Sequence, residues 1–407
     1  MEKLMKAHGN WVEKDRFWDR EPEIRLFTQL LDEGAHILLT AQRRMGKTSL
    51  MREVGRRIQE RYLCIFVDLE KCEGSPDAVA ELSTATIPYA NLWEKTKNLF
   101  SNIFGRVEAI DIKDIAIKLR SGITAGDWKS KGDQLLAMIA DYGKPIVIFM
   151  DEVPILVNRL LKGSDYKITE DRRREADMFM SWLRDNALRH KDKIRFVITG
   201  SIGLEPVLHQ ANLSSTLAGF KPFDLKPWSE DIAASCIQAL ANQYQIVFQP
   251  GVCDAMVKKL GCCIPHHVQM FFDHIHDESR LRNISEISFE FVNDVYEKNM
   301  FSSRGHAELS HFEERLKTVL GEEYFPLAID LLTEAAVNGF LSPEVATMIS
   351  KRYSFGSDHV LREIIGILEH DGYFLQKERY YRFVSNLLKD WWKARFAFTY
   401  RPAKTKR

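Results

Sequence analysis

Short apolar runs recur along the first half of the chain, and the longer stretches between them carry apolar residues at helical spacing. The runs cover residues 36–40, 63–68, 146–150, 194–199 and 223–225. Strands buried on both faces have such continuous apolar sequences, and their alternation with helices is typical of a parallel sheet. We therefore predict an α/β domain over residues 1–226, with a helical insertion at about residues 72–142.

After residue 229 the pattern changes to helices alone. Apolar residues recur at three- and four-residue spacing in residues 231–242, 251–260, 265–275 and 288–298. This spacing predicts a small helical bundle. We assign residues 227–305 to a helical lid.

The last part of the chain predicts a winged helix. Ser342 and Pro343 are the residue types of a helix cap and a first helical position, and a second helix is predicted over residues 358–370. Asp371-Gly372 then leads into aromatic-rich runs at 373–376 and 380–384, which indicate a hairpin. The winged helix is assigned to residues 306–400, and a basic tail to residues 401–407.

Charge and hydropathy limit the classes of function that the sequence supports. The 57 Lys and Arg residues balance 57 Asp and Glu, so binding to nucleic acid has to be argued from a local basic patch. The apolar runs are far shorter than the roughly 18 to 20 residues of a membrane span. The N-terminal residues lack the apolar stretch of a secretory signal, and we expect a cytoplasmic protein without a membrane partner.

The six cysteines are too few and too irregularly spaced for a disulfide framework, so we expect free thiols. Cys262 and Cys263, followed by His266 and His267, are residue types that ligate zinc. Adjacent ligands strain a tetrahedral site, and a second Cys/His pair at finger-like spacing is missing. We favour buried cysteines that pack as small apolar side chains.

The sharpest motif lies between the run 36–40 and a helical stretch at 49–59. Its spacing is that of a phosphate-binding loop, G-x-x-x-x-G-K-[ST], with Ala41 in place of the first glycine. Backbone amides at 45–48 would form an anion cradle, Lys47 would reach the terminal phosphates, and the Thr48 hydroxyl would ligate Mg²⁺. A chance match is the alternative, which the strand-loop-helix context disfavours. We assign nucleotide binding to Ala41, Gln42, Arg43, Arg44, Met45, Gly46, Lys47, Thr48 and Ser49.

Two carboxylates, Asp151 and Glu152, follow the apolar run 146–150. Ligands bind at the carboxyl ends of strands in open α/β sheets. Asp151 would hold Mg²⁺ through water, and Glu152 would orient and deprotonate the water that attacks the γ-phosphate. An acidic pair after a strand is often only a helix cap, but together with the loop it indicates a catalytic site.

The run 194–199 ends in Gly200-Ser201, which places a hydroxyl at the same edge of the predicted sheet. Ser201, with Thr199 as the second candidate, would hydrogen-bond the γ-phosphate or the attacking water. The alternative is a serine that serves a cap or a turn.

These motifs, with Phe17-Trp18-Asp19-Arg20-Glu21 upstream and Pro222-Phe223-Asp224-Leu225 and Trp228-Ser229 downstream, resemble a known family. The family is the archaeal-type ATPase group within the AAA+-like and STAND P-loop NTPases. Its upstream box reads F-x-G-R-E, so Asp19 and Ala41 each stand where the family has glycine.

The resemblance extends over nearly the whole chain. It implies an α/β P-loop ATPase core, a helical lid and a C-terminal winged helix, with ATP and Mg²⁺ as cofactors. It also implies that Gly261 and Pro265 contact nucleotide from the lid, and that ATP binding and hydrolysis switch the conformation.

An arginine from one subunit could complete the site of a neighbour in a homo-oligomer. Arg184 and Arg189, within residues 179–189, are the candidates for such an arginine finger. A solvated helix face is the alternative reading.

The second helix of the winged helix is a poor DNA-reading element, because Asp358, Glu363 and Glu369 accompany Arg362. The predicted hairpin is more basic, and Lys377, Arg379 and Arg382 are candidates for contacts with DNA phosphates. The basic stretch continues to Lys404, Lys406 and Arg407. A contact with a partner protein is the alternative.

Two function hypotheses remain. The first is an ATP-hydrolysing switch that couples nucleotide state to double-stranded DNA or to an effector protein, with Lys47, Glu152 and Ser201 in the catalytic site. The second is a nucleotide-responsive DNA-binding regulator or assembly scaffold with little or no turnover. Glu152 favours the first hypothesis, and Ala41 favours the second.

Overall fold

The computed structural model describes residues 4–7, 11–104 and 112–403, without the side chains of residues 112, 113, 303, 304 and 306. Lys404, Lys406 and Arg407 of the predicted basic tail lie outside the described residues. The chain divides into two compact units. One unit contains residues 21–40 and 50–224, and the other contains residues up to 20, 41–49 and 225 onward.

A five-stranded sheet with parallel pairing forms the centre of the first unit, in the order β2-β3-β4-β1-β5. The strands are β1 (His36–Thr40), β2 (Leu63–Asp68), β3 (Ile146–Asp151), β4 (Ile194–Thr199) and β5 (Phe220–Asp224). The prediction of a parallel α/β core is confirmed. β3 and β4 are almost wholly buried, as their continuous apolar sequences predict.

The prediction for the last strand was wrong in its bounds, because β5 begins at Phe220 rather than at residue 223. β5 is an edge strand with only Phe220 and Phe223 buried, so its sequence does not form a continuous apolar run. An edge position also tolerates Pro222, which has no amide hydrogen for a sheet bond.

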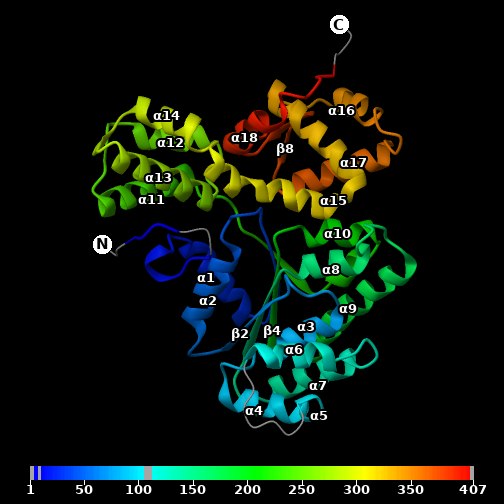
Figure 1. Ribbon diagram of the computed structural model, residues 1–407. Coiled ribbons are helices and arrows are strands. Elements are labelled where there is room, and N and C mark those ends of the chain that lie inside the picture. The colour runs from blue at the N-terminus through cyan, green and yellow to red at the C-terminus, as the bar shows by residue number, and fades with distance from the viewer. Residues whose placement is uncertain (1–3, 8–10, 105–111, 404–407) are drawn as a thin grey trace. The chain divides into compact units, whose positions relative to one another are not determined.

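Helices cover this sheet and fill the predicted insertion. Around the sheet lie α1 (Glu21–Asp32), α2 (Lys47–Ile58), α8 (Val153–Lys162), α9 (Glu170–Arg189), α10 (Leu204–Gln210) and the short η2 (Ser214–Leu217). The insertion contains α3 (Ser75–Thr84), α4 (Ala90–Leu99), α5 (Ser101–Phe104), α6 (Ile112–Gly122) and α7 (Trp128–Ala140). Figure 1 shows α4, α5, α6 and α7 grouped together at one end of this unit.

The second unit begins with η1 (Lys14–Arg16) and continues, after residue 225, with the helical lid. The lid helices are α11 (Glu230–Tyr244), α12 (Val252–Leu260), α13 (Pro265–Leu281) and α14 (Phe289–Lys298). Two short parallel strands, β6 (Val247–Phe248) and β7 (Glu286–Ile287), join the lid loops, and a purely helical pattern did not predict them. Strands of two residues are too short to produce a periodicity.

The C-terminal part is a winged helix. It contains α15 (Ser303–Asn338), α16 (Pro343–Ser350), α17 (Asp358–His370), the hairpin β8 (Phe374–Lys377) and β9 (Tyr380–Phe383), and α18 (Asn386–Phe396). Ser342 caps α16 as its residue type predicts, since its hydroxyl accepts a bond of 3.3 Å from the Val345 amide. α15 is interrupted at Gly321, whose φ of 70° and ψ of −179° are not helical.

The aromatic stripe of α18 belongs to the core of the winged helix. Trp391 and Trp392 are 1% and 0% exposed, and the Trp392 ring lies 6.1 Å from that of Tyr373. This rules out a base-stacking role for the two tryptophans, because a stacking platform has to be exposed. Within the described residues, every helix is too short or too polar to span a bilayer.

Candidate nucleotide-binding site

The phosphate loop connects β1 to α2, as its motif predicts. Arg44 and Gly46 have positive φ angles of 66° and 88°, whereas Ala41 has no positive φ. The first loop position therefore does not require glycine here, and alanine fits without backbone strain. Gly46 does occupy the left-handed region, where glycine is favoured.

Lys47 is turned back onto its own loop. Its side chain is buried, and Nζ donates hydrogen bonds to the backbone oxygens of Ala41 at 2.9 Å and Gln42 at 3.1 Å. The ammonium group thus lies against the carbonyls at the start of the loop, while the residue itself stands in the first turn of α2.

The upstream box supports the same loop. Arg20 is 5% exposed and donates hydrogen bonds to the backbone oxygens of Lys226 at 2.8 Å and Met45 at 3.4 Å. Asp19 has a φ of 54°, and aspartate is one of the few residue types other than glycine that tolerate this region. Ser49 accepts a bond of 2.9 Å from the Val12 amide, so residues 41–49 are fixed to the N-terminal segment.

The winged helix also contacts the loop, through Gly372 at the turn before β8. Gly372 has a φ of 80°, and a Cβ atom built on it would lie 2.1 Å from Cδ of Gln42. A Cβ atom there would require the Gln42 side chain to move, and the positive φ itself favours glycine. Sequence reasoning treated Asp371-Gly372 as a simple turn and missed this contact.

Three histidines lie close to the loop arginines, and sequence reasoning did not place them in the site. His266 and His267 stand in the first turn of α13, and His311 stands on α15. Burial is the main cause of the low pKa of His266, and Arg44, His267, Arg43 and His311 lower it further. Pro265 is the first residue of α13 and is buried, while Gly261 packs against Asn386 of α18.

In the other unit, the two predicted carboxylates follow β3. Glu152 caps α8 with φ 60° and ψ 27°, and its amide donates to Oδ1 of Asp151 at 3.0 Å. The Ser201 amide and hydroxyl both donate to Oε2 of Glu152 at 2.9 Å. Gly200 is needed for this approach, because a Cβ on it would lie 2.4 Å from Pro154.

The two predicted hydroxyls thus have different partners. Ser201 contacts the carboxylate of Glu152, while Thr199 donates to the backbone oxygen of Leu39 at 2.7 Å and so links β4 to β1. Thr199 is buried in the sheet, which leaves Ser201 as the hydroxyl beside the acidic pair.

The other candidate residues stand on α9 and on the hairpin of the winged helix. Arg184 and Arg189 stand on α9, where Arg189 lies 3.5 Å from Asp133 and Arg184 lies 4.0 Å from Asp185. On the hairpin, Arg379 pairs with Glu344 of α16, while Lys377 and Arg382 are exposed. The described residues contain no cluster of three or more His, Cys, Asp or Glu that could hold a metal ion by themselves.

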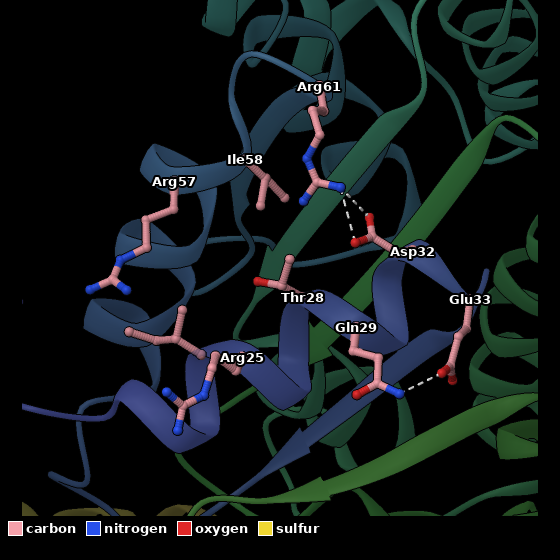
Figure 2. A pocket seen from close by; sticks show the side chains of 9 residues that line it. Arg25, Thr28, Gln29, Asp32, Glu33, Arg57, Ile58 and Arg61 are labelled. Atoms are coloured by element: carbon pink, nitrogen blue, oxygen red, sulfur yellow. Dashed lines mark hydrogen bonds and ion pairs between the residues drawn. The ribbon is translucent and has the colours of Figure 1, made fainter.

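A hollow of about 550 Å³ lies between α1 and the end of α2 (Figure 2). Arg61 binds both carboxylate oxygens of Asp32 there, at 2.9 and 3.0 Å, and Arg57 forms an ion pair with Glu21 at 2.5 Å. The hollow is at the opposite end of α2 from the phosphate loop. We therefore do not include it in the nucleotide site.

The strand order β2-β3-β4-β1-β5, the loop between β1 and α2, the helical lid and the winged helix together form a fold that solved structures share. A Walker-type ATPase of Pyrococcus abyssi has this fold, with a TM-score of 0.61 at 14% identity over 94% of this chain and 98% of that chain. The ORC2 protein of Aeropyrum pernix, solved in ADPNP-ADP complexes, gives a TM-score of 0.51 at 11% identity over 94% and 98%. No protein-family model and no curated protein matches the chain.

Proposed function

We propose that the protein is an ATP-binding and ATP-hydrolysing switch of the AAA+-like and STAND type. The observation that carries this proposal is Lys47, which is buried on the carbonyls of a loop whose Gly46 has the positive φ of a phosphate cradle. A buried ammonium group at a helix N-terminus fits a polyphosphate. The nucleotide complexes of the Aeropyrum pernix protein, which shares the fold, support this assignment.

The residues of the proposed site divide the binding of phosphates, the binding of Mg²⁺ and the activation of water among them. Lys47 binds the terminal phosphates, and the backbone amides at residues 45–48 orient them. Thr48 and Asp151 would hold Mg²⁺, which supplies charge neutralisation to the phosphates when bound. Glu152 accepts a proton from the attacking water, and Ser201 holds the carboxylate of Glu152 in place.

The sheet supports the joint use of these residues. The phosphate loop continues β1, and Asp151 and Glu152 continue β3, so both segments leave the carboxyl ends of parallel strands in one sheet. Ligands of open α/β sheets bind at that edge.

The proposed output is a contact of the winged helix with double-stranded DNA or an effector protein in the cytoplasm. For DNA, the exposed Lys377 and Arg382 would contact phosphates without reading bases. In a homo-oligomer, Arg184 or Arg189 would complete the site of a neighbouring subunit.

A second candidate is a nucleotide-binding regulator without turnover. It is favoured by the two bonds that Ser201 makes to Glu152, because a carboxylate oxygen occupied by two donors is a weaker base for water.

Steady-state ATP hydrolysis with and without double-stranded DNA tests the proposal. The wild type is compared with Lys47→Ala, Glu152→Gln and the control His359→Gln, whose side chain is 79% exposed on α17. We expect turnover in the wild type and the control, and its loss in the other two variants. ATP binding that depends on Lys47, with no turnover in the wild type, would favour the regulator instead.

A further inference from the structure

Residues 4–7, near the N-terminus, lie on the helical lid. The Lys6 amide donates a hydrogen bond to the Tyr244 hydroxyl at 3.2 Å, and the Ala7 amide donates to Oε1 of Gln269 at 3.0 Å. Tyr244 is the last residue of α11 and Gln269 stands on α13, so this short segment is attached to two lid helices at once. Both donors are backbone amides, so the course of the chain itself fixes these contacts.

The Lys6 side chain attaches the segment further. Its ammonium group forms ion pairs with Asp273 and, at 3.2 Å, with Asp277, and it donates to Nδ1 of His276 at 2.9 Å. An ammonium group has three hydrogens to donate, and these three acceptors match them in number. The side chains of Lys6 and Asp273 are 10% and 11% exposed, so solvent screens their ion pair weakly. We call this cluster the Lys6 latch.

The same N-terminal region is attached to the phosphate loop at its other end. The Val12 amide donates to Oγ of Ser49 at 2.9 Å. The Arg20 guanidinium donates to the backbone oxygen of Met45 at 3.4 Å. Met45 and Ser49 lie on either side of residues 46–48, to which we assign phosphate and Mg²⁺ binding. The N-terminal region therefore holds the loop at both ends of its phosphate-binding part.

The two attachments belong to one folded piece of chain. The Met5 amide donates to the backbone oxygen of Asp15 at 2.7 Å, which holds the part on the lid against the part that leads to the loop. Leu4 is buried as well, at 5% exposure. We call residues 4–7 and 11–20 the N-terminal strap. Its contacts with the lid and with the loop lie within one compact unit of the protein.

We propose that the N-terminal strap ties the lid to the phosphate loop, and that the Lys6 latch controls the rate at which nucleotide leaves. The inference rests on the proposed function, because it concerns the release of nucleotide from the same loop. The loop and the lid are far apart in the sequence, and the strap joins them through contacts within the protein. A lid that moves away from the loop therefore has to break the strap at one end. The free energy of that break raises the barrier to release.

Loss of either attachment should accelerate release. Without the Lys6 latch, a nearly buried ion pair no longer opposes lid opening, and the dissociation rate should rise about tenfold. The strap acts only while both ends are attached, so loss of one end removes the effect of the other. A double variant should therefore release nucleotide no faster than the faster single variant. Two unrelated local defects would instead multiply their effects on the rate.

The dissociation rate of a fluorescent N-methylanthraniloyl derivative of ADP tests the inference, in stopped flow with Mg²⁺ and a chase of excess unlabelled ADP. The full-length wild type is compared with Lys6→Met, which removes the ammonium group, and with Val12→Pro, which removes the amide hydrogen that Ser49 accepts. The matched controls are Val12→Ala, which keeps that amide, and Lys258→Met, the same loss of charge at an exposed position of α12. Lys6→Arg restores a cation and should recover slow release.

We expect release about tenfold faster in Lys6→Met and in Val12→Pro, with no further increase in the double variant. Both controls should release the ADP derivative at the rate of the wild type. Val12→Pro leaves the ion pairs of Lys6 in place, so it tests the strap even if Lys6→Met disturbs the folding of the lid. Unchanged release in Val12→Pro, or effects that multiply in the double variant, would overturn the inference. An absence of binding of the ADP derivative to the wild type would instead contradict the proposed function.

Discussion

Ser201 donates two hydrogen bonds to one carboxylate oxygen of Glu152, from its amide and from its hydroxyl, each 2.9 Å long. The amide bond does not depend on the side chain, whereas the hydroxyl bond does. Ser201 is therefore a positioning residue for the proposed base, and its contribution can be removed without deleting the carboxylate.

Ser201→Ala should lower kcat for ATP hydrolysis by about 3- to 30-fold, because one charge-assisted hydrogen bond is lost. KM should change little, since the phosphate loop remains intact. Ser201→Thr, which restores a hydroxyl, is the matched control and should recover most of the activity. Equal kcat for wild type and Ser201→Ala would show that the hydroxyl does not position the base.

Gly372→Ala should destabilise the protein by about 1 to 3 kcal/mol in urea-induced unfolding. Two effects cause this loss of stability. The residue has a φ of 80°, which strains alanine, and a Cβ atom would overlap the Gln42 side chain. The double variant Gln42→Ala/Gly372→Ala should recover the part that comes from overlap and keep the part that comes from φ. Gly339→Ala, with a φ of 81° and open space at Cβ, is the control for backbone strain alone.

The buried His36 predicts a loss of stability in acid. Burial, and secondly the charge of Arg195, lowers the pKa of His36 to about 4. Nδ1 of His36 accepts a hydrogen bond of 3.1 Å from the Phe196 amide. The unfolded chain binds a proton below about pH 6.5, whereas the folded protein does not until about pH 4, so stability falls as pH falls between these values.

This loss should be on the order of 2 kcal/mol between neutral pH and about pH 4.5. The free energy of unfolding is measured in urea at both pH values. His36→Gln should show a smaller loss over the same interval. An identical pH dependence in the two proteins would mean that His36 titrates normally in the fold.

Lys6 and Asp273 form a nearly buried ion pair, with side-chain exposures of 10% and 11%. Asp277 lies 3.2 Å from the same ammonium group, and Nδ1 of His276 lies 2.9 Å from it. Lys6→Met should destabilise the protein by about 2 to 4 kcal/mol, because it leaves a carboxylate buried without its partner.

The double variant Lys6→Met/Asp273→Leu should be closer to the wild type in its free energy of unfolding than Lys6→Met is. A double-mutant cycle measured by urea unfolding gives the coupling energy directly. Strict additivity of the two single changes would contradict a direct interaction between these side chains.

The strands and the winged helix could be predicted because their signals are local. β2 and β4 have the predicted bounds, and Asp371-Gly372 correctly indicates the hairpin. A continuous apolar run marks a strand only where both faces are buried, so the edge strand β5 was placed too late. The break of α15 at Gly321 has no counterpart in the apolar pattern of the sequence.

The sequence predicted the motifs of the candidate site but not the contacts between their side chains. The loop residues and the acidic pair carry recognisable spacing, whereas the contact of Glu152 with Ser201 joins positions 49 residues apart. The approach of His266 and His311 to Arg43 and Arg44 depends on how the lid and α15 pack, which periodicity does not report. Histidines on an apolar helix face look like ordinary core residues in the sequence.

Residues 41–49 are covalently continuous with β1 and α2, yet they group with residues up to 20 and from 225 onward, and Ser49, Met45 and Gln42 lie against Val12, Arg20 and Gly372. Binding of a ligand to this segment would therefore stabilise the unit that contains the lid and the winged helix. Amide hydrogen exchange should consequently slow at sites distant in sequence, including the turn at Gly372, when nucleotide occupies the loop. In that sense the nucleotide would act as part of the tertiary structure of the C-terminal half of the chain.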